Sequence, residues 1–225
     1  MPNNAGSAAS GILTEKEVKE MISQLGVKAT NCHEAFSLDE VLSLAENTGF
    51  PVVLKVNSLK ITHKSDIGGV RLNLGSKAEV KEAYQQIMAR SLPLDPGATV
   101  TVQRMAKPGL EVIVGMTTTP QFGRVVMFGL GGIYAELLKD TSFSLVPVTR
   151  SAAEDMVRSI NGRKLLQGFR GGPAADQEAI IAIIEAVSAL CEKHPKITEL
   201  DLNPVIVYER GAVVVDARAA VIQEI

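Results

Sequence analysis

The stretch PVVLKVNSLKITHKSDIGGV, from Pro51 to Val70, decides how the rest of the sequence is interpreted. A nearly continuous apolar run, VVLKV, surrounds Lys55 and predicts a strand that is covered on both faces. An ammonium group in such a strand loses its hydration unless it reaches an anion or the edge of the sheet. The polar loop that follows carries His63 and Lys64 just ahead of Gly68 and Gly69. A lysine in a buried strand, followed by this loop, indicates phosphate chemistry; the alternative is a lysine that reaches solvent at a sheet edge.

The composition limits the class of protein and of partner. The 225 residues are 46% hydrophobic and 21% charged, which suits one large domain or two lobes that share a core. The net charge of −2 and the aromatic content of 4% argue against a nucleic-acid partner. We find no signal peptide or membrane-length apolar run, and therefore expect a cytoplasmic protein without a membrane partner. Cys32 and Cys191 match no metal-binding spacing, and Cys191 continues the apolar stripe of a helix, so we expect it to be a reduced core residue.

The first part of the chain alternates helix and strand signals. Residues 1–10 are small and polar, and we expect them to form a disordered tail. Capping residues predict helices that begin after Thr14, Ser37 and Ser76. Strands are expected at about 27–30, 52–56 and 70–74. The turn-rich segment 92–97 is expected to join lobe one, at about 11–97, to lobe two, at about 98–225.

The second part carries mostly strand signals and two longer helices. Strands are expected at 99–105, 110–116 and 124–128, with shorter ones at about 135–138 and 143–146. Helices are expected at 151–160 and 177–193, and the second has a continuous apolar stripe. The chain closes with strands at 197–202, 205–208 and 212–216. Gly129, Gly131 and Gly132 interrupt the strand pattern, which a tight turn would also explain.

Near the end of the chain, the pattern predicts that three oxygen-bearing side chains lie close together. On one strand, Asp201 and Asn203 point to the same face, about 7 Å apart. Counting back from the turn at 209–211 places Asp216 opposite Asn203, or one residue away if Gly211 forms a bulge. Hard oxygen ligands in an open site suit Mg²⁺ that is held jointly with nucleotide phosphates. The alternative is that the two carboxylates end their strands and face water.

Six stretches together resemble one family, the ATP-grasp β subunit of ADP-forming (NDP-forming) acetyl-CoA and other acyl-CoA synthetases. The β subunit of succinyl-CoA synthetase is a more distant match. The stretches are FPVVLKV, THKSDIGGVRLNL, GLEVIVGM, FGLGGIYAELLKD, KLLQGFRGGPAAD and ELDLNPVIV, the last followed by VVVDAR. They extend from about residue 11 to residue 219, and the combination of THKSDIGGV with ELDLNPV is specific.

The resemblance implies an ATP-grasp fold over residues 11–225, with two α+β lobes that grip ATP or ADP. It also implies roles for individual residues. Lys55 would bind nucleotide phosphates, and the linker beside the adenine would consist of Gln103, Arg104 and Met105. Glu111 would hold the ribose, and Gly131 and Gly132 would also lie at the nucleotide. Asn203 and Asp216 would bind Mg²⁺, with Asp201 alongside.

The resemblance further implies the reaction acid + CoA + ATP ⇌ acyl-CoA + ADP + phosphate. His63 matches the β-subunit histidine that becomes phosphorylated in this family, and Lys64 can screen the phosphoryl group. A phosphoramidate retains most of the transfer potential, so passage through an imidazole nitrogen stays reversible. The sequence lacks the family's CoA-binding and ligase domains, and we therefore expect a CoA-binding α subunit as partner, in an α2β2 heterotetramer.

Two alternatives belong to other functional classes. A regulatory module that binds ATP without turnover is one, since related ATP-grasp segments are fused to protein acetyltransferases. The joint presence of His63, Lys64 and the three metal-site residues favours catalysis over sensing. An ATP-grasp carboxylate–amine ligase is the second alternative, and it is disfavoured because such enzymes usually carry a further N-terminal domain.

Overall fold

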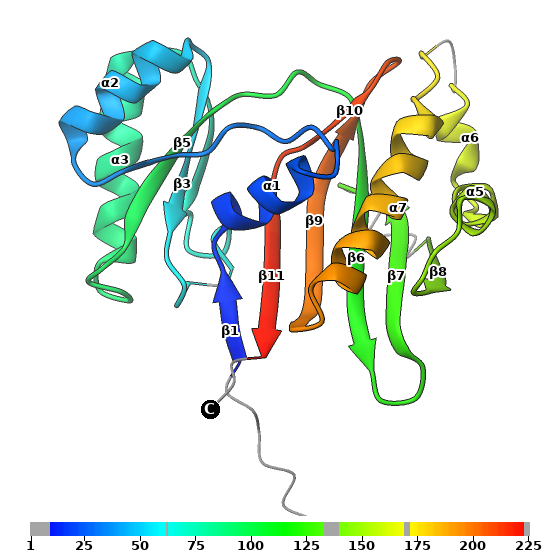
Figure 1. Ribbon diagram of the computed structural model, residues 1–225. Helices are drawn as coiled ribbons and strands as arrows, with labels where there is room; N and C mark the ends of the chain where they lie inside the picture. Colours follow the sequence, from blue (N-terminus) through cyan, green and yellow to red (C-terminus); the bar gives the residue numbers. More distant parts are fainter. Residues whose placement is uncertain (1–9, 62, 133–139, 169–171, 223–225) are drawn as a thin grey trace, which may run out of the picture. The chain divides into compact units, whose positions relative to one another are not determined.

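The strand that carries Lys55, β3 (Val52–Asn57), lies inside a four-stranded antiparallel sheet in a computed structural model of the chain. The strand order is β2 (His33–Ala35), β5 (Thr99–Arg104), β3 and β4 (Val70–Leu74) (Figure 1). Lys55 pairs with Val70 on one neighbouring strand and with Thr101 on the other. Its strand is therefore an interior one and not an edge.

Two helices pack on one face of this sheet. Helix α2 (Leu38–Thr48) begins at the cap Ser37, and α3 (Lys77–Ser91) begins at the cap Ser76, as the sequence predicts. In both cases the serine hydroxyl accepts a hydrogen bond from the backbone N–H three residues later, which satisfies a group that the helix leaves free. The core below them consists mainly of valine, isoleucine, leucine and alanine: Val41, Ala45, Val80, Ala83 and Ile87 from the helices, and Val52, Leu54, Val56, Val100 and Val102 from the strands.

The structure describes residues 10–61, 63–132, 140–168 and 172–222, and these divide into two compact units. One unit is Thr30–Lys107, and the other combines Met1–Ala29, in its described part, with Pro108–Ile225. The segment 92–97, expected to join the lobes, is instead a turn within the first unit, because β5 after it returns to pair with β3. The first helix, which we placed in lobe one, lies in the second unit.

The second unit is built on a seven-stranded antiparallel sheet. Its order is β1 (Ser10–Leu13), β11 (Ala217–Ile222), β9 (Ile197–Val207), β6 (Leu110–Thr119), β7 (Gly123–Leu130) and β8 (Thr141–Leu145), with β10 (Ala212–Val214) also on β9 (Figure 1). The strands from the two ends of the chain pair with each other, with Gly11 opposite Val221.

The helices that the structure describes in this unit pack against one face of its sheet. They are α1 (Glu15–Ser23), α5 (Arg150–Ser159), the short α6 (Arg163–Leu166) and α7 (Gln177–Lys193). Thr14 caps α1 through the predicted capping box with Glu17. The apolar stripe of α7 ends at Cys191, a fully buried thiol whose pKa is raised to about 11 by desolvation. This agrees with the expectation that Cys191 is a reduced core residue.

Several expected strands differ from those observed. Segment 27–30 is not a strand, and only Ala29 makes an isolated bridge, to Val214. Strand β9 continues from Ile197 to Val207 through Pro204, where two strands were expected. It can do so because Pro204 still accepts a hydrogen bond, from Val215 N, through its carbonyl. The tail at 1–9 and the strand expected at 135–138 lie outside the described residues.

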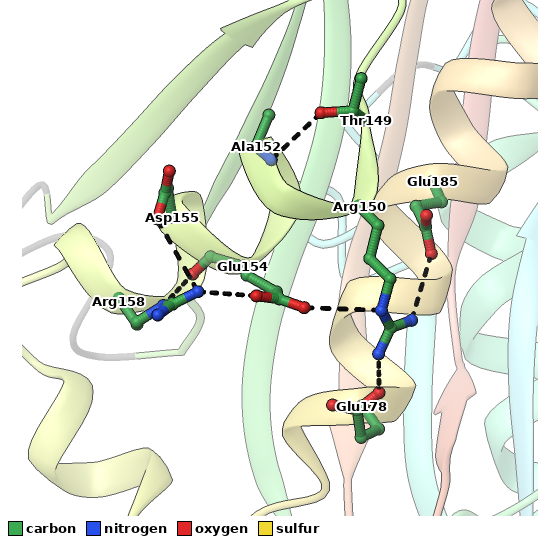
Figure 2. A network of polar contacts seen from close by, with 8 residues as sticks. All are labelled: Thr149, Arg150, Ala152, Glu154, Asp155, Arg158, Glu178 and Glu185. Carbon is green, nitrogen blue, oxygen red and sulfur yellow. Dashed lines mark hydrogen bonds and ion pairs between the residues drawn. The ribbon is translucent and has the colours of Figure 1, made fainter.

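Arg150 links the start of α5 to α7 through ion pairs on the surface (Figure 2). Its guanidinium pairs with Glu178, lies 3.5 Å from Glu154 Oε1 and 3.8 Å from Glu185 Oε2. Hydrogen bonding to Glu178 is the largest cause of a raised pKa at Arg150. The arginine side chain is 52% exposed, so solvent screens these pairs, and they contribute little to stability. We interpret this network as a structural contact and not a site.

Candidate functional site

The face of the four-stranded sheet opposite α2 and α3 carries buried polar groups. Lys55 is 3% exposed, and Thr101 and Gln103 are equally buried. Lys55 and Thr101 are direct cross-strand partners, and Gln103 follows two residues later on the same face of β5. The amide of Gln103 accepts a hydrogen bond from Thr30 Oγ1 at 3.0 Å and donates one to Cys32 Sγ at 3.5 Å. A buried cation on a polar face is suited to bind an anion.

The hydroxyl of Thr101 has no protein partner in this arrangement. Among the buried side-chain nitrogen and oxygen atoms of the described residues, Thr101 Oγ1 is the one that makes no hydrogen bond. Leaving a buried hydroxyl unsatisfied costs free energy unless a ligand or water completes it. The sequence analysis did not identify this residue. The signal that could have indicated it is its position two residues before Gln103 on one strand, which places both side chains on the same face.

The residues expected beside the adenine lie at the end of β5. Arg104 is exposed and pairs with Val52 in the sheet, and Met105 N donates a hydrogen bond to Pro51 O at 3.0 Å. The backbone here is therefore fixed to the start of the Lys55 strand. The first unit ends two residues later, at Lys107.

His63 lies in the connection between β3 and β4. Its side chain is exposed, and the chain then turns tightly, with Gly69 N donating to Lys64 O at 2.7 Å. Gly69 must lack a side chain, because a Cβ there would lie 2.6 Å from Val56 Cγ1 and 2.9 Å from Lys64 O. Gly68 has a φ of +65°, which favours glycine. The glycines thus form the turn that follows an accessible histidine.

In the second unit, the three predicted metal ligands do come together. Asn203 N donates to Asp216 O at 3.1 Å, which places the two residues opposite each other, as counting from the turn predicts. Asp201 lies two residues before Asn203 and pairs with Arg218 on β11. The core-facing side chains of β9 include Leu200 and Leu202, so Asp201 and Asn203 point to the opposite face, on which none of the described helices packs.

Burial, together with the neighbouring charges, raises the pKa of the Asp201 carboxyl above its ordinary value. Desolvation is the largest cause, followed by repulsion from Glu199 and Asp216. Arg218 and a hydrogen bond to Asn203 act in the opposite direction. A bound cation would reduce the electrostatic repulsion between these partly desolvated carboxylates. Within the described ranges, no group of three or more His, Cys, Asp or Glu side chains is arranged to hold a metal ion.

Glu111 lies on β6 next to the glycine turn after β7. Gly131 N donates to Glu111 O at 2.8 Å, and a Cβ on Gly132 would lie 2.9 Å from Glu111 Oε2. Gly132 also has a φ of +58°. The two glycines therefore let the turn approach the Glu111 carboxylate closely. They form a tight turn, and this does not exclude the role at the nucleotide that the resemblance implies for them together with Glu111. Glu111 therefore lies beside these glycines. It is not a cross-strand neighbour of Asp201, because Glu111 pairs with Ile206 of β9, whereas Asp201 pairs with Gly115.

Comparison with known proteins identifies relatives over nearly the whole chain. Residues 4–221 match the family model described as an ATP-grasp domain. The β subunit of acetate–CoA ligase (ADP-forming) I from Pyrococcus furiosus is 42% identical over 92% of this chain and 90% of its own length. Acetate–CoA ligase (ADP-forming) II from Archaeoglobus fulgidus is 45% identical over 93% of this chain. The match covers only 30% of that longer protein.

Solved structures give the same grouping. An acetyl-coenzyme A synthetase from Candidatus Korarchaeum cryptofilum, in complex with coenzyme A and Ca-AMPCP, has a TM-score of 0.89 and 42% identity, over 95% of this chain and 94% of that one. A second structure of that enzyme contains Mg-AMPPCP, with its phosphohistidine segment pointing towards the nucleotide-binding site. It has a TM-score of 0.80 and 41% identity, over 95% and 93% of the two chains.

Proposed function

Because this chain belongs to the ATP-grasp domain family, in the group of ADP-forming acetate–CoA ligase β subunits, we propose that it is the nucleotide-binding module of an ADP-forming acyl-CoA synthetase. The reaction is acid + CoA + ATP ⇌ acyl-CoA + ADP + phosphate. The observation that carries this proposal is that each unit's sheet has one face on which none of the described helices packs, and predicted site residues lie on these faces. Lys55 lies on one such face, and Asp201 and Asn203 lie on the other, with Asp216 opposite Asn203.

Nucleotide binding is supported by the donors on the Lys55 face. A lysine that is 3% exposed and a hydroxyl without a protein partner are together suited to the anionic oxygens of ATP or ADP. The backbone at Gln103–Met105 would lie beside the adenine, and Glu111 with its glycine turn would bind the ribose. Phosphoryl transfer depends mainly on positioning and charge neutralisation, which is the role we assign to Lys55.

Mg²⁺ binding is assigned to Asn203 and Asp216, with Asp201 alongside. The fit rests on the chemistry of the donors, two carboxylates and one amide oxygen, and on the raised pKa of Asp201 among like charges. Mg²⁺, when bound, would neutralise charge on the nucleotide phosphates. The protein would hold these oxygens on β9 and on the segment between β10 and β11, which is hydrogen-bonded to β9.

His63 is proposed to carry the phosphoryl group. In the direction of ATP synthesis, the P–N bond of phosphohistidine breaks, a terminal oxygen of ADP forms the new P–O bond, and the imidazole is released. An exposed histidine followed by a tight glycine turn suits such a carrier, and we assign to the neighbouring Lys64 the screening of the phosphate. A regulatory module that only senses ATP would not need this histidine.

The remaining chemistry is assigned to a partner. The chain matches about 90% of the length of a separate β subunit but about a third of the single-chain enzymes from A. fulgidus. We propose a CoA-binding α subunit as that partner, in an α2β2 assembly, and we assign the binding of CoA and of the carboxylic acid mainly to it.

Two measurements test the proposal. Titration calorimetry should detect MgADP binding to this chain alone, and Lys55→Met should abolish it. An assay with acetate, CoA and MgATP should give acyl-CoA only after addition of an α-type subunit. Absence of nucleotide binding to a folded chain would rule out the proposed function, and rapid turnover without a partner would rule out the division between two subunits.

A further inference from the structure

Thr101 lies at the centre of the polar face that carries Lys55, and no sequence motif drew attention to it. Its side chain is 4% exposed, and its Oγ1 makes no hydrogen bond to any described residue. We infer that Thr101 is a nucleotide-binding residue whose hydroxyl hydrogen-bonds the nucleoside diphosphate that Lys55 binds. The inference rests on the proposed function and adds a residue to its site.

The geometry places the hydroxyl next to the lysine. Strands β3 and β5 are antiparallel, with Lys55 directly opposite Thr101. Side chains of such a pair project from the same face, with Cβ atoms about 5 Å apart. Gln103, the next residue on that face, has its amide directed to Thr30 and Cys32. Lys55 and Thr101 therefore form a cation and a neutral donor at adjacent positions, which is a suitable arrangement for an oxygen-rich anion.

A purely structural role for the hydroxyl is disfavoured by comparison with Thr99 on the same strand. Thr99 Oγ1 donates to Glu34 Oε1 at 2.7 Å and accepts from Asn57 Nδ2 at 3.0 Å, so its hydroxyl is satisfied within the protein. Thr101 has the same side chain two residues later and on the same face, but without such partners. Valine would fill its volume without the desolvation cost of an unpaired hydroxyl. A ligand explains why threonine is present at a position where valine would fit.

The test compares Thr101→Val, Thr101→Ser and the control Thr99→Val by two readouts. In calorimetry, Thr101→Val should weaken MgADP binding about tenfold, as expected for the loss of one hydrogen bond to an anionic group. Thr101→Ser keeps the hydroxyl and should bind MgADP with the wild-type affinity. In thermal unfolding without nucleotide, Thr101→Val should leave the melting temperature unchanged or raise it. Thr99→Val should lower that temperature and leave MgADP affinity unchanged.

Each outcome is decisive. Unchanged MgADP affinity in Thr101→Val would overturn the inference, and so would a loss of thermal stability as large as that of Thr99→Val, because the hydroxyl would then have a protein partner. If the wild-type chain binds MgADP and Lys55→Met does not, the proposed function stands whatever the result at Thr101. If the folded wild-type chain binds no nucleotide, the proposed function itself fails, and the inference fails with it.

Discussion

Replacing Lys19 by methionine removes the cation of a buried ion pair on helix α1. Lys19 Nζ lies 2.6 Å from Glu15 Oε1, and both side chains are 4% exposed. The same nitrogen donates a hydrogen bond to Val215 O at 2.7 Å, in the segment that leads from β10 to β11. Methionine keeps an unbranched apolar stem of similar length, so the packing of α1 should change little. The perturbation is therefore mainly electrostatic.

The expected loss of stability is large. Removing the cation takes away the buried charge that lies 2.6 Å from the Glu15 carboxylate, and breaking a buried pair in this way costs about 3–5 kcal/mol. The stability of a folded domain is only about 5–15 kcal/mol, so this loss should be obvious. The double variant Glu15→Gln/Lys19→Met removes both charges and should recover much of the loss, because neutral replacement of a buried pair is often tolerated. The two substitutions should therefore be strongly non-additive.

The assay is urea unfolding followed by far-UV circular dichroism, since the sequence has no tryptophan for fluorescence. The matched control is Lys16→Met, which breaks a pair with the same spacing on the same helix. Lys16 Nζ lies 4.0 Å from Glu20 Oε1, with side chains 57% and 61% exposed. It should cost less than about 1 kcal/mol. Equal losses for Lys19→Met and Lys16→Met would refute the argument from burial.

Three further results are expected. His63→Ala should leave MgADP affinity nearly intact and abolish phosphoryl transfer, and labelled ATP with the partner should give an acid-labile, alkali-stable phosphoprotein signal in the wild type alone. Asp216→Ala should weaken MgADP binding and lower the rate at least ~100-fold without unfolding the chain; unchanged affinity and rate would place the metal elsewhere. Hydrogen bonds from the N–H groups of Gly211 and Ala179 lower the pKa of Asp176 in the folded state, so its stabilising effect is present above the unfolded pKa and lost as pH falls through the folded one. Asp176→Asn should therefore reduce the melting temperature near pH 7 but not near pH 2, and a constant difference across that range would contradict this assignment.

Local signals in the sequence predicted the parts of the fold that depend on neighbouring residues. The caps Thr14, Ser37 and Ser76 each begin a helix because their hydroxyls meet backbone N–H groups three residues ahead. The pairing of Asp216 with Asn203 could be counted from the turn between their strands, since a hairpin fixes its own register. Both inferences need only a short stretch of chain.

Features that depend on distant contacts could not be predicted in this way. Strand β1 is four residues long, and its partner β11 lies at the other end of the chain. The lobe boundary was misplaced because nothing in segment 92–97 indicates that β5 returns to β3. The unsatisfied hydroxyl of Thr101 is a property of the folded face, because an isolated threonine on a strand is ordinary.

The position of Asp216 depends on contacts that are not part of the site. Val215 O, in the residue before it, accepts a hydrogen bond from buried Lys19. Val214 N donates to Lys28 O, and the turn that begins this segment is held by Asp176, which accepts from Gly211 N. Three separate parts of the second unit therefore fix the short segment that carries Asp216, one of the proposed metal ligands. A carboxylate held this firmly can keep its place beside other negative charges, which is what binding a cation requires before the cation arrives. The buried ion pair of α1 thus belongs to the support of the site as well as to the core.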